Sequence, residues 1–181
     1  KNFLYIGTAC SYPLEKQMEI GSKPLLEDEV YPANPESGYG WSKLMGEYEL
    51  TLAGKLSNMN TGILRLHNVY GPPCEVSEER SQVIPSLARK LILDEDFIVW
   101  GSGSQRRAFL YIDDVIDGIL KYLKQGFGHG CIQLSPYEST SIADIANKLV
   151  KISNKKVNVK FDTTKPEGDK DRTGNIEKAK K

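Results

Sequence analysis

Two side chains that could perform acid–base chemistry lie four residues apart at the start of a predicted helix. They are the phenol of Tyr39 and the ammonium of Lys43, in the run Tyr39-Gly40-Trp41-Ser42-Lys43. Residues at positions i and i+4 share a helix face, so both groups can point into one site. A nearby lysine favours the phenolate and lowers the pKa of a tyrosine from about 10. The spacing therefore predicts a general base, although the same pattern is common by chance.

A hydroxyl and a thiol follow a short apolar run upstream of this helix. Residues 2–6 predict a buried strand, and Thr8 and Cys10 lie just beyond it. The Thr8 hydroxyl could bind a ligand or cap the main chain at the strand end. Its place before Cys10 and upstream of Tyr39 favours the functional role. Cys10 could transfer protons or fill a small apolar space, as most free cysteines do.

Composition and charge argue against several classes of protein. The 181 residues are enough for one full core, in one or two small lobes. Lysine plus arginine and aspartate plus glutamate number 24 each, so no overall field favours a nucleic acid or a membrane surface. No apolar run is long enough to span a bilayer, and no secretory leader is visible. Three cysteines without Cys-x-x-Cys spacing argue against a disulfide framework or a metal site, and the cytoplasm is the expected location.

Helices and strands alternate along the chain, which predicts an α/β fold. A proline-containing loop at 11–37 and a polar loop at 72–81 interrupt the pattern. We expect Thr140 to cap the helix that follows it. The last twenty residues are mostly charged, and their composition alone is compatible with a solvated tail. The predicted strands are 2–6, 62–66, 97–100, 109–112, 132–134 and 157–161. The first predicted helix starts within Asn34-Pro35-Glu36-Ser37, with Asn34 or Ser37 as its cap, and runs to residue 56. The other predicted helices are 83–93, 113–123 and 140–152.

The helix that carries Tyr39 and Lys43 has an apolar stripe with helical spacing. The stripe can pack on the helix's own sheet or form an interface with a second copy of the chain, and its spacing does not decide between them. Its members are Trp41, Leu44, Met45, Tyr48, Leu52 and Leu56.

Four motifs follow one another in a fixed order along most of the chain. They are Thr8-Ala9-Cys10-Ser11-Tyr12-Pro13; Tyr39 to Lys43; His67-Asn68-Val69-Tyr70-Gly71-Pro72; and Trp100-Gly101-Ser102-Gly103 followed by Arg107-Ala108-Phe109-Leu110-Tyr111-Ile112-Asp113-Asp114. Together they resemble the extended short-chain dehydrogenase/reductases, the NAD(P)-dependent nucleotide-sugar epimerases and dehydratases. The resemblance implies a partial Rossmann-like parallel sheet, made of the C-terminal strands and helices of that fold, with a smaller α/β substrate-binding lobe.

The same resemblance implies a division of the chain. Residues 1–72 would be the C-terminal part of the dinucleotide-binding domain, and residues 73–181 mainly the nucleotide-sugar lobe, with 95–125 returning to the core domain. The family also has a Gly-x-x-Gly-x-x-Gly turn that holds the cofactor pyrophosphate, and this sequence contains none. We therefore expect a C-terminal part of a larger enzyme that is inactive alone. The cofactor is expected to be NAD, with NADP possible.

The resemblance also implies a role for each residue of the site. Tyr39 would take a proton from the sugar 4-hydroxyl while C4 passes a hydride to the cofactor, Thr8 would hydrogen-bond the same oxygen, and Lys43 would bind the nicotinamide ribose. The helix of Tyr39 and Lys43 would form a homodimer interface. Other cofactor contacts are expected from Leu66 and His67, and nucleotide-sugar contacts from Asn68, Gln82, Lys90, Arg107 and Arg172.

Cys10 narrows the resemblance to the GDP-mannose 3,5-epimerases and GDP-fucose synthases, which use a cysteine here to move protons beside a 4-keto group. Both pair it with a second proton-transfer residue, and that position here is Gln82, whose amide cannot exchange protons usefully near neutral pH. Epimerisation of a GDP-mannose-like sugar is the first hypothesis, with Lys90 or His67 as substitute groups. The alternatives are a GDP-fucose-synthase-like reductase, a UDP-sugar 4-epimerase, or an inactive domain that only binds a nucleotide sugar.

Overall fold

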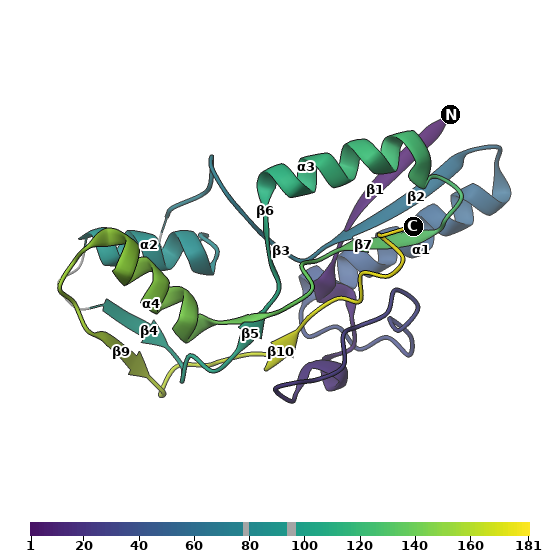
Figure 1. The fold of residues 1–181 in the computed structure, drawn as a ribbon. Helices are drawn as coiled ribbons and strands as arrows, with labels where there is room; N and C mark the ends of the chain where they lie inside the picture. Colours follow the sequence, from purple (N-terminus) through teal and green to yellow (C-terminus); the bar gives the residue numbers. More distant parts are fainter. Residues whose placement is uncertain (78–79, 94–96) are drawn as a thin grey trace.

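Figure 1 shows a chain built as two neighbouring parts that short strand pairs connect. The computed structural model describes residues 1–77, 80–93 and 97–181. Parallel strands flanked by helices make up both parts, so the predicted α/β fold is confirmed.

The first part is a parallel sheet in the order β1-β2-β7. Its register aligns Thr8 with Leu66 and Leu66 with Leu134, so the strands end together at one edge. Ligands of open parallel sheets bind beyond this carboxyl edge. Figure 1 shows helices α1 and α3 along opposite faces of the sheet. The elements are β1 (Asn2–Thr8), α1 (Gly38–Leu56), β2 (Asn60–Leu66), α3 (Ile112–Lys121), the wider helical turn η3 (Tyr122–Gly126) and β7 (Cys131–Leu134).

Helix α1 begins after Ser37, the later of the two possible caps in the predicted start Asn34-Pro35-Glu36-Ser37. The Ser37 hydroxyl accepts a hydrogen bond from the main-chain N–H of Gly40 at 3.2 Å. The face toward the sheet buries Gly40, Leu44, Glu47 and Leu50, which are spaced about one turn apart. Of the predicted apolar stripe only Leu44 belongs to this face. The remaining stripe residues, Trp41, Met45, Tyr48, Leu52 and Leu56, are exposed, so they do not pack on the sheet of their own chain.

The second part packs two helices on a pair of parallel strands. Its core consists of Leu87, Leu91, Phe97, Val99, Ile142 and Ala146, which come from three of these four elements. Burial of such apolar side chains is the main force that holds them together. The elements are α2 (Val83–Leu93), β4 (Phe97–Trp100), α4 (Ile142–Ser153) and β9 (Val159–Asp162).

Short strands connect the two parts beside the carboxyl edge of the sheet. β3 (Asn68–Tyr70) pairs with β6 (Phe109–Tyr111), and β5 (Arg106–Arg107) lies between β8 (Thr140–Ser141) and β10 (Asp171–Arg172). Two short 3₁₀ turns, η1 (Ala9–Ser11) and η2 (Leu14–Gln17), follow β1.

The strand pairing divides the chain differently from the expected division. The range 95–125, expected to return to the core domain, is split: β4 pairs with β9 in the second part, whereas α3 lies against the first. The difference arises because β4 buries Phe97 and Val99 under α2 and α4. Strand β7, outside that range, completes the sheet with β1 and β2.

One local prediction near the C-terminus is wrong. Ser141, not Thr140, caps α4, since its hydroxyl accepts from the main-chain N–H of Asp144 at 3.0 Å. The last twenty residues are not a solvated tail, because Asp169, Asp171 and Arg172 are buried and paired. Within the ranges that the structure describes, no helix is long and apolar enough to cross a bilayer.

Candidate active site

A cleft of about 1130 Å³ opens at the carboxyl edge of the sheet, between the two parts of the molecule. Every residue that the sequence assigns to the site contributes to its lining. These residues are Thr8, Cys10, Tyr39, Lys43, Leu66, His67, Asn68, Gln82, Lys90, Arg107 and Arg172. The structure therefore brings together side chains that lie as far apart as β1 and β10 in the sequence.

A close approach between α1 and η1 sets the position of Tyr39. A Cβ atom at Gly40 would lie 2.2 Å from the carbonyl oxygen of Cys10, so only glycine lets the first turn of the helix come this near. Tyr39 is 55% exposed and lines the cleft beside Cys10. Lys43, one turn later, donates from Nζ to the carbonyl oxygen of Ile6 at 3.1 Å. Phenol and ammonium thus reach the same cleft from one helix.

The Thr8 hydroxyl serves the main chain as well as facing the cleft. Its Oγ1 accepts a hydrogen bond from the main-chain N–H of Cys10 at 3.2 Å, which caps η1. The capping role considered from the sequence is therefore present. A hydroxyl that accepts one bond still carries a proton, so Thr8 can also donate to a ligand.

Two arginines of the cleft, contributed by β5 and β10, share one carboxylate. Asp169 Oδ1 lies 2.7 Å from Arg107 Nη2, and Asp169 Oδ2 lies 2.7 Å from Arg172 Nη2; the second contact is an ion pair without hydrogen-bond geometry. Burial lowers the pKa of Arg107, Asp169 opposes that shift, and the neighbouring Arg172 adds to it. Arg172 also donates from Nη1 to the sulfur of Cys10 at 3.2 Å.

His67 is a buried, neutral imidazole at the end of β2. Burial lowers its pKa to about 4, and the nearby Arg172 and Arg65 add to the shift. Its Nε2 lies 3.0 Å from Gln133 Oε1, and within the described part of the chain its Nδ1 has no hydrogen-bond partner. A group with so low a pKa is poorly suited to act as a base near pH 7, which argues against His67 as the substitute proton-transfer group.

The second part contributes an amide, an ammonium and an indole. Gln82 is exposed, lines the cleft and precedes α2. Lys90 Nζ donates to the carbonyl oxygen of Ile98 at 3.2 Å and lies 5.2 Å from the centre of the Trp100 ring. Both contacts hold the ammonium of Lys90 in place at the wall of the cleft.

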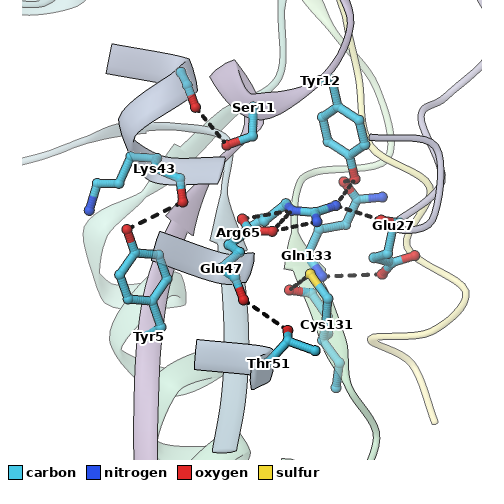
Figure 2. A network of polar contacts seen from close by, with 12 residues as sticks. Tyr5, Ser11, Tyr12, Glu27, Lys43, Glu47, Thr51, Arg65, Cys131 and Gln133 are labelled. Carbon is cyan, nitrogen blue, oxygen red and sulfur yellow. Dashed lines mark hydrogen bonds and ion pairs between the residues drawn. The ribbon is translucent and has the colours of Figure 1, made fainter. Parts of the chain in front are cut away.

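A buried polar network behind the cleft was not predicted from the sequence. Figure 2 shows Arg65 between Glu47 and Tyr12. Arg65 makes a bidentate pair with Glu47, with Nη2 to Oε2 at 2.6 Å, and its Nη1 donates to the Tyr12 hydroxyl at 3.2 Å. Burial is the largest single influence on Arg65 and lowers its pKa, but the hydrogen bond to Glu47 and the charge interactions with Cys131, Tyr12 and Glu47 together outweigh it and raise the pKa. Because Glu47 lies one turn after Lys43, this pair fixes the helix face that Lys43 presents to the cleft.

Residues 1–131 match the family model described as "NAD dependent epimerase/dehydratase family". This chain belongs to that family. A similar protein is the GDP-mannose 3,5-epimerase of Arabidopsis thaliana, 32% identical over 87% of this chain and 42% of its own length. A putative GDP-L-fucose synthase 2 of the same plant is 29% identical, over 93% of this chain and 52% of its own. The chain spans about half the length of the family members that it matches.

Solved structures of family members have the same fold. A UDP-glucuronic acid 4-epimerase from Bacillus cereus, in complex with UDP-glucuronic acid and NAD, is 30% identical and superposes with a TM-score of 0.83 over 99% of this chain and 54% of its own. A UDP-glucose 4-epimerase from Thermotoga maritima superposes with a TM-score of 0.87 at 21% identity, which shows the fold alone. The predicted Rossmann-like sheet and the predicted family are confirmed.

The sequence did not predict Asp169, the carboxylate that pairs with two arginines of the cleft. It lies 62 residues from Arg107 and three from Arg172, in the segment whose composition is compatible with a solvated tail. One signal was available: an acid three residues before an arginine already assigned to the site could have been its partner.

Proposed function

We propose that the protein carrying this chain is an NAD(P)-dependent epimerase that acts on a nucleotide sugar through transient oxidation at C4. One observation carries the proposal: the phenol of Tyr39, the hydroxyl of Thr8 and the thiol of Cys10 face the same cleft as the cations Lys90 and Arg107. Acid–base groups on one wall and cations on the other suit a sugar joined to a pyrophosphate.

The residues present fit the nicotinamide end of the cofactor. Tyr39 and Lys43 line the cleft together with Leu66 and His67, and the buried Nδ1 of His67 offers a polar contact that no described residue uses. The sequence has no glycine turn that could hold the pyrophosphate. When bound, NAD(P) would accept the hydride from C4 of the sugar.

The proton chemistry at C4 is assigned to two side chains of this chain. Tyr39 would take the proton of the sugar 4-hydroxyl as C4 is oxidised, and return it when C4 is reduced. Thr8 would donate a hydrogen bond to the same oxygen and hold it beside Tyr39. Lys43 would bind the ribose next to the nicotinamide and favour the phenolate of Tyr39. Arg107 and Lys90 would hold the diphosphate of the substrate.

A GDP-mannose-like sugar is the first choice of substrate, supported by Cys10 beside the proposed oxidation site and by the similarity to the plant epimerase. Epimerisation at C4 of a UDP-sugar is the second choice. It needs no second proton-transfer residue, and the amide of Gln82 supplies none. The similarity to the 4-epimerase of Bacillus cereus also supports it.

Replacing Tyr39 by Phe in the intact protein tests the reaction type. We expect loss of most turnover with little change in substrate affinity, because only the phenolic hydroxyl is removed. The control is Tyr137→Phe, an exposed tyrosine outside α1 that does not line this cleft. If Tyr39→Phe turns over a panel of GDP- and UDP-sugars as fast as the unmodified protein, the assignment fails.

The same assay in D₂O distinguishes epimerisation at C3 or C5 from epimerisation at C4. Epimerisation at C3 or C5 passes through an enolate, so solvent deuterium enters the product at these carbons. Epimerisation at C4 returns the same hydride and leaves C3 and C5 unlabelled. Analysis of the product by NMR distinguishes the outcomes.

We also propose that α1 forms a homodimer interface. Its exposed face carries Trp41, Met45 and Tyr48, an apolar surface that the chain's own sheet does not cover. Trp41→Glu in the intact protein should shift the mass measured by light scattering from dimer to monomer.

A further inference from the structure

A direct contact between Arg172 and Cys10 points to a role for this arginine other than binding phosphate. Nη1 of Arg172 donates to the sulfur of Cys10 at 3.2 Å. Its Nε donates to Gln17 Oε1, and its Nη2 pairs with Asp169. Arg172 is only 6% exposed, and the protein already engages each nitrogen of its guanidinium. It is therefore less free than Lys90 to receive a phosphate from the cleft.

Cations outnumber carboxylates among the charged groups around Cys10. Arg172 and Arg107 from the C-terminal half share the single carboxylate of Asp169, and both are largely buried. The other titratable groups near Cys10 are the ammonium of Lys43 and the phenol of Tyr39 on α1, the neutral imidazole of His67 after β2, and the carboxylate of Glu36 before α1. Taken together, these described groups hold three cations against two carboxylates.

We propose that Arg172 is a positioning residue that holds Cys10 as a thiolate facing the cleft. An N–H group of a guanidinium makes a stronger hydrogen bond to a thiolate than to a thiol, because the acceptor is then charged. Gln17 and Asp169 fix the guanidinium, so its Nη1 points at the sulfur without further ordering.

The chemical consequence rests on the proposed function. Once C4 of the sugar is a ketone, the thiolate of Cys10 removes a proton from the adjacent carbon. The C–H bond breaks, an S–H bond forms, and the electron pair of the C–H bond moves into an enolate whose charge lies on the C4 oxygen. Arg172 lowers the cost of holding the anionic sulfur before this step.

Alkylation by iodoacetamide tests the proposal without relying on any enzyme activity. The thiolate is the reacting species, so the rate is measured at each cysteine by mass spectrometry as a function of pH. Cys74 is exposed and serves as the ordinary thiol. Cys131 is largely buried, burial raises its pKa to about 12, and its protection reports that the fold is intact. We expect Cys10 to reach half its maximal rate about one pH unit below Cys74, equivalent to about tenfold more thiolate at a given pH.

Two variants test whether Arg172 causes the lower pH profile of Cys10. Arg172→Met should move the pH profile of Cys10 up to that of Cys74, whereas Arg106→Met removes an arginine that contacts Ser139 instead and should leave the profile unchanged. An unchanged profile in Arg172→Met with Cys131 still protected overturns the proposal. If Arg172→Met exposes Cys131, its fold is no longer intact and the unmodified chain is the test. Coincident pH profiles of Cys10 and Cys74 in the unmodified chain also overturn the proposal.

Kinetics of the intact protein separate this role from phosphate binding. A positioning residue predicts that Arg172→Met lowers kcat about tenfold and leaves KM for the nucleotide sugar nearly unchanged. A raised KM with an unchanged alkylation profile would assign Arg172 to the phosphates instead. A shifted profile together with no turnover of any nucleotide sugar by the unmodified protein would refute the proposed function and leave the thiolate assignment intact.

Discussion

Replacing Gly40 by Ala tests whether the contact between α1 and η1 sets the site. The new Cβ atom would lie 2.2 Å from the carbonyl oxygen of Cys10 and 2.9 Å from Cβ of Pro35. Since the first of these atoms is main chain, it cannot rotate away, and the helix or η1 must shift. Overpacking of this kind costs about 1–3 kcal/mol. Alanine at a compatible helical position stabilises by about 0.4–1 kcal/mol, which offsets part of the loss.

Gly38→Ala is the matched control, two residues earlier in the same helix. A Cβ atom there would meet nothing within 4 Å, so only the stabilising effect remains. The difference in unfolding free energy between the two variants therefore isolates the packing cost, about 1–3 kcal/mol in favour of Gly38→Ala. Urea denaturation measures it. Equal stabilisation by both substitutions would refute the close approach and the placement of Tyr39 that depends on it.

Three further outcomes follow from buried polar groups and caps. Glu47→Leu should destabilise the fold by about 3–5 kcal/mol, because Arg65 is left as an uncompensated buried charge, and adding Arg65→Met should recover part of that loss in urea denaturation. His67 stays neutral in the folded chain down to pH about 4, whereas the unfolded chain protonates it near pH 6.5. The free energy of unfolding should therefore fall by up to about 3 kcal/mol as the pH drops from 6.5 to 4. His67→Gln should remove that decline. Ser141→Ala should lower the free energy of unfolding, measured by thermal denaturation, by about 1 kcal/mol, and Thr140→Ala should lower it clearly less. A larger loss in Thr140→Ala would show that Thr140 is the cap, as the sequence predicts.

Local rules predicted where the residues proposed for proton chemistry lie, whereas their roles came from the resemblance to the family. Helical spacing puts Tyr39 and Lys43 on one face, and the end of a buried strand puts Thr8 and Cys10 at the carboxyl edge of the sheet. Each rule uses only neighbours in the sequence.

The ion pairs were not predictable because their partners are distant in the sequence. Glu47 and Arg65 lie 18 residues apart, and Arg107 and Asp169 lie 62 apart. Charged composition suggested solvent exposure for the last twenty residues, yet the fold buries Arg172 by giving it acids and amides as partners. Composition describes what a segment contains, whereas burial depends on what the rest of the chain supplies.

The exposed side of α1 shows the same limit. Its apolar stripe suited either the helix's own sheet or another surface, and the periodicity is identical in both cases. The structure decides part of this, because Trp41 and Tyr48 point away from the sheet and the opposite face carries Gly40 and Glu47. Small and charged residues face the sheet here, which hydrophobic periodicity alone does not reveal.

The run 170–175 lies across segments from the N-terminal and the central parts of the polypeptide. Its main chain bonds to Gln17, Leu25 and Ala108, and the Gln133 side chain donates to it (yellow in Figure 1). Anyone trimming the polypeptide for crystallisation or display should therefore keep it through residue 175. Cutting earlier would remove hydrogen bonds that hold Arg172 at the cleft, whereas a tag attached after residue 181 leaves these bonds in place.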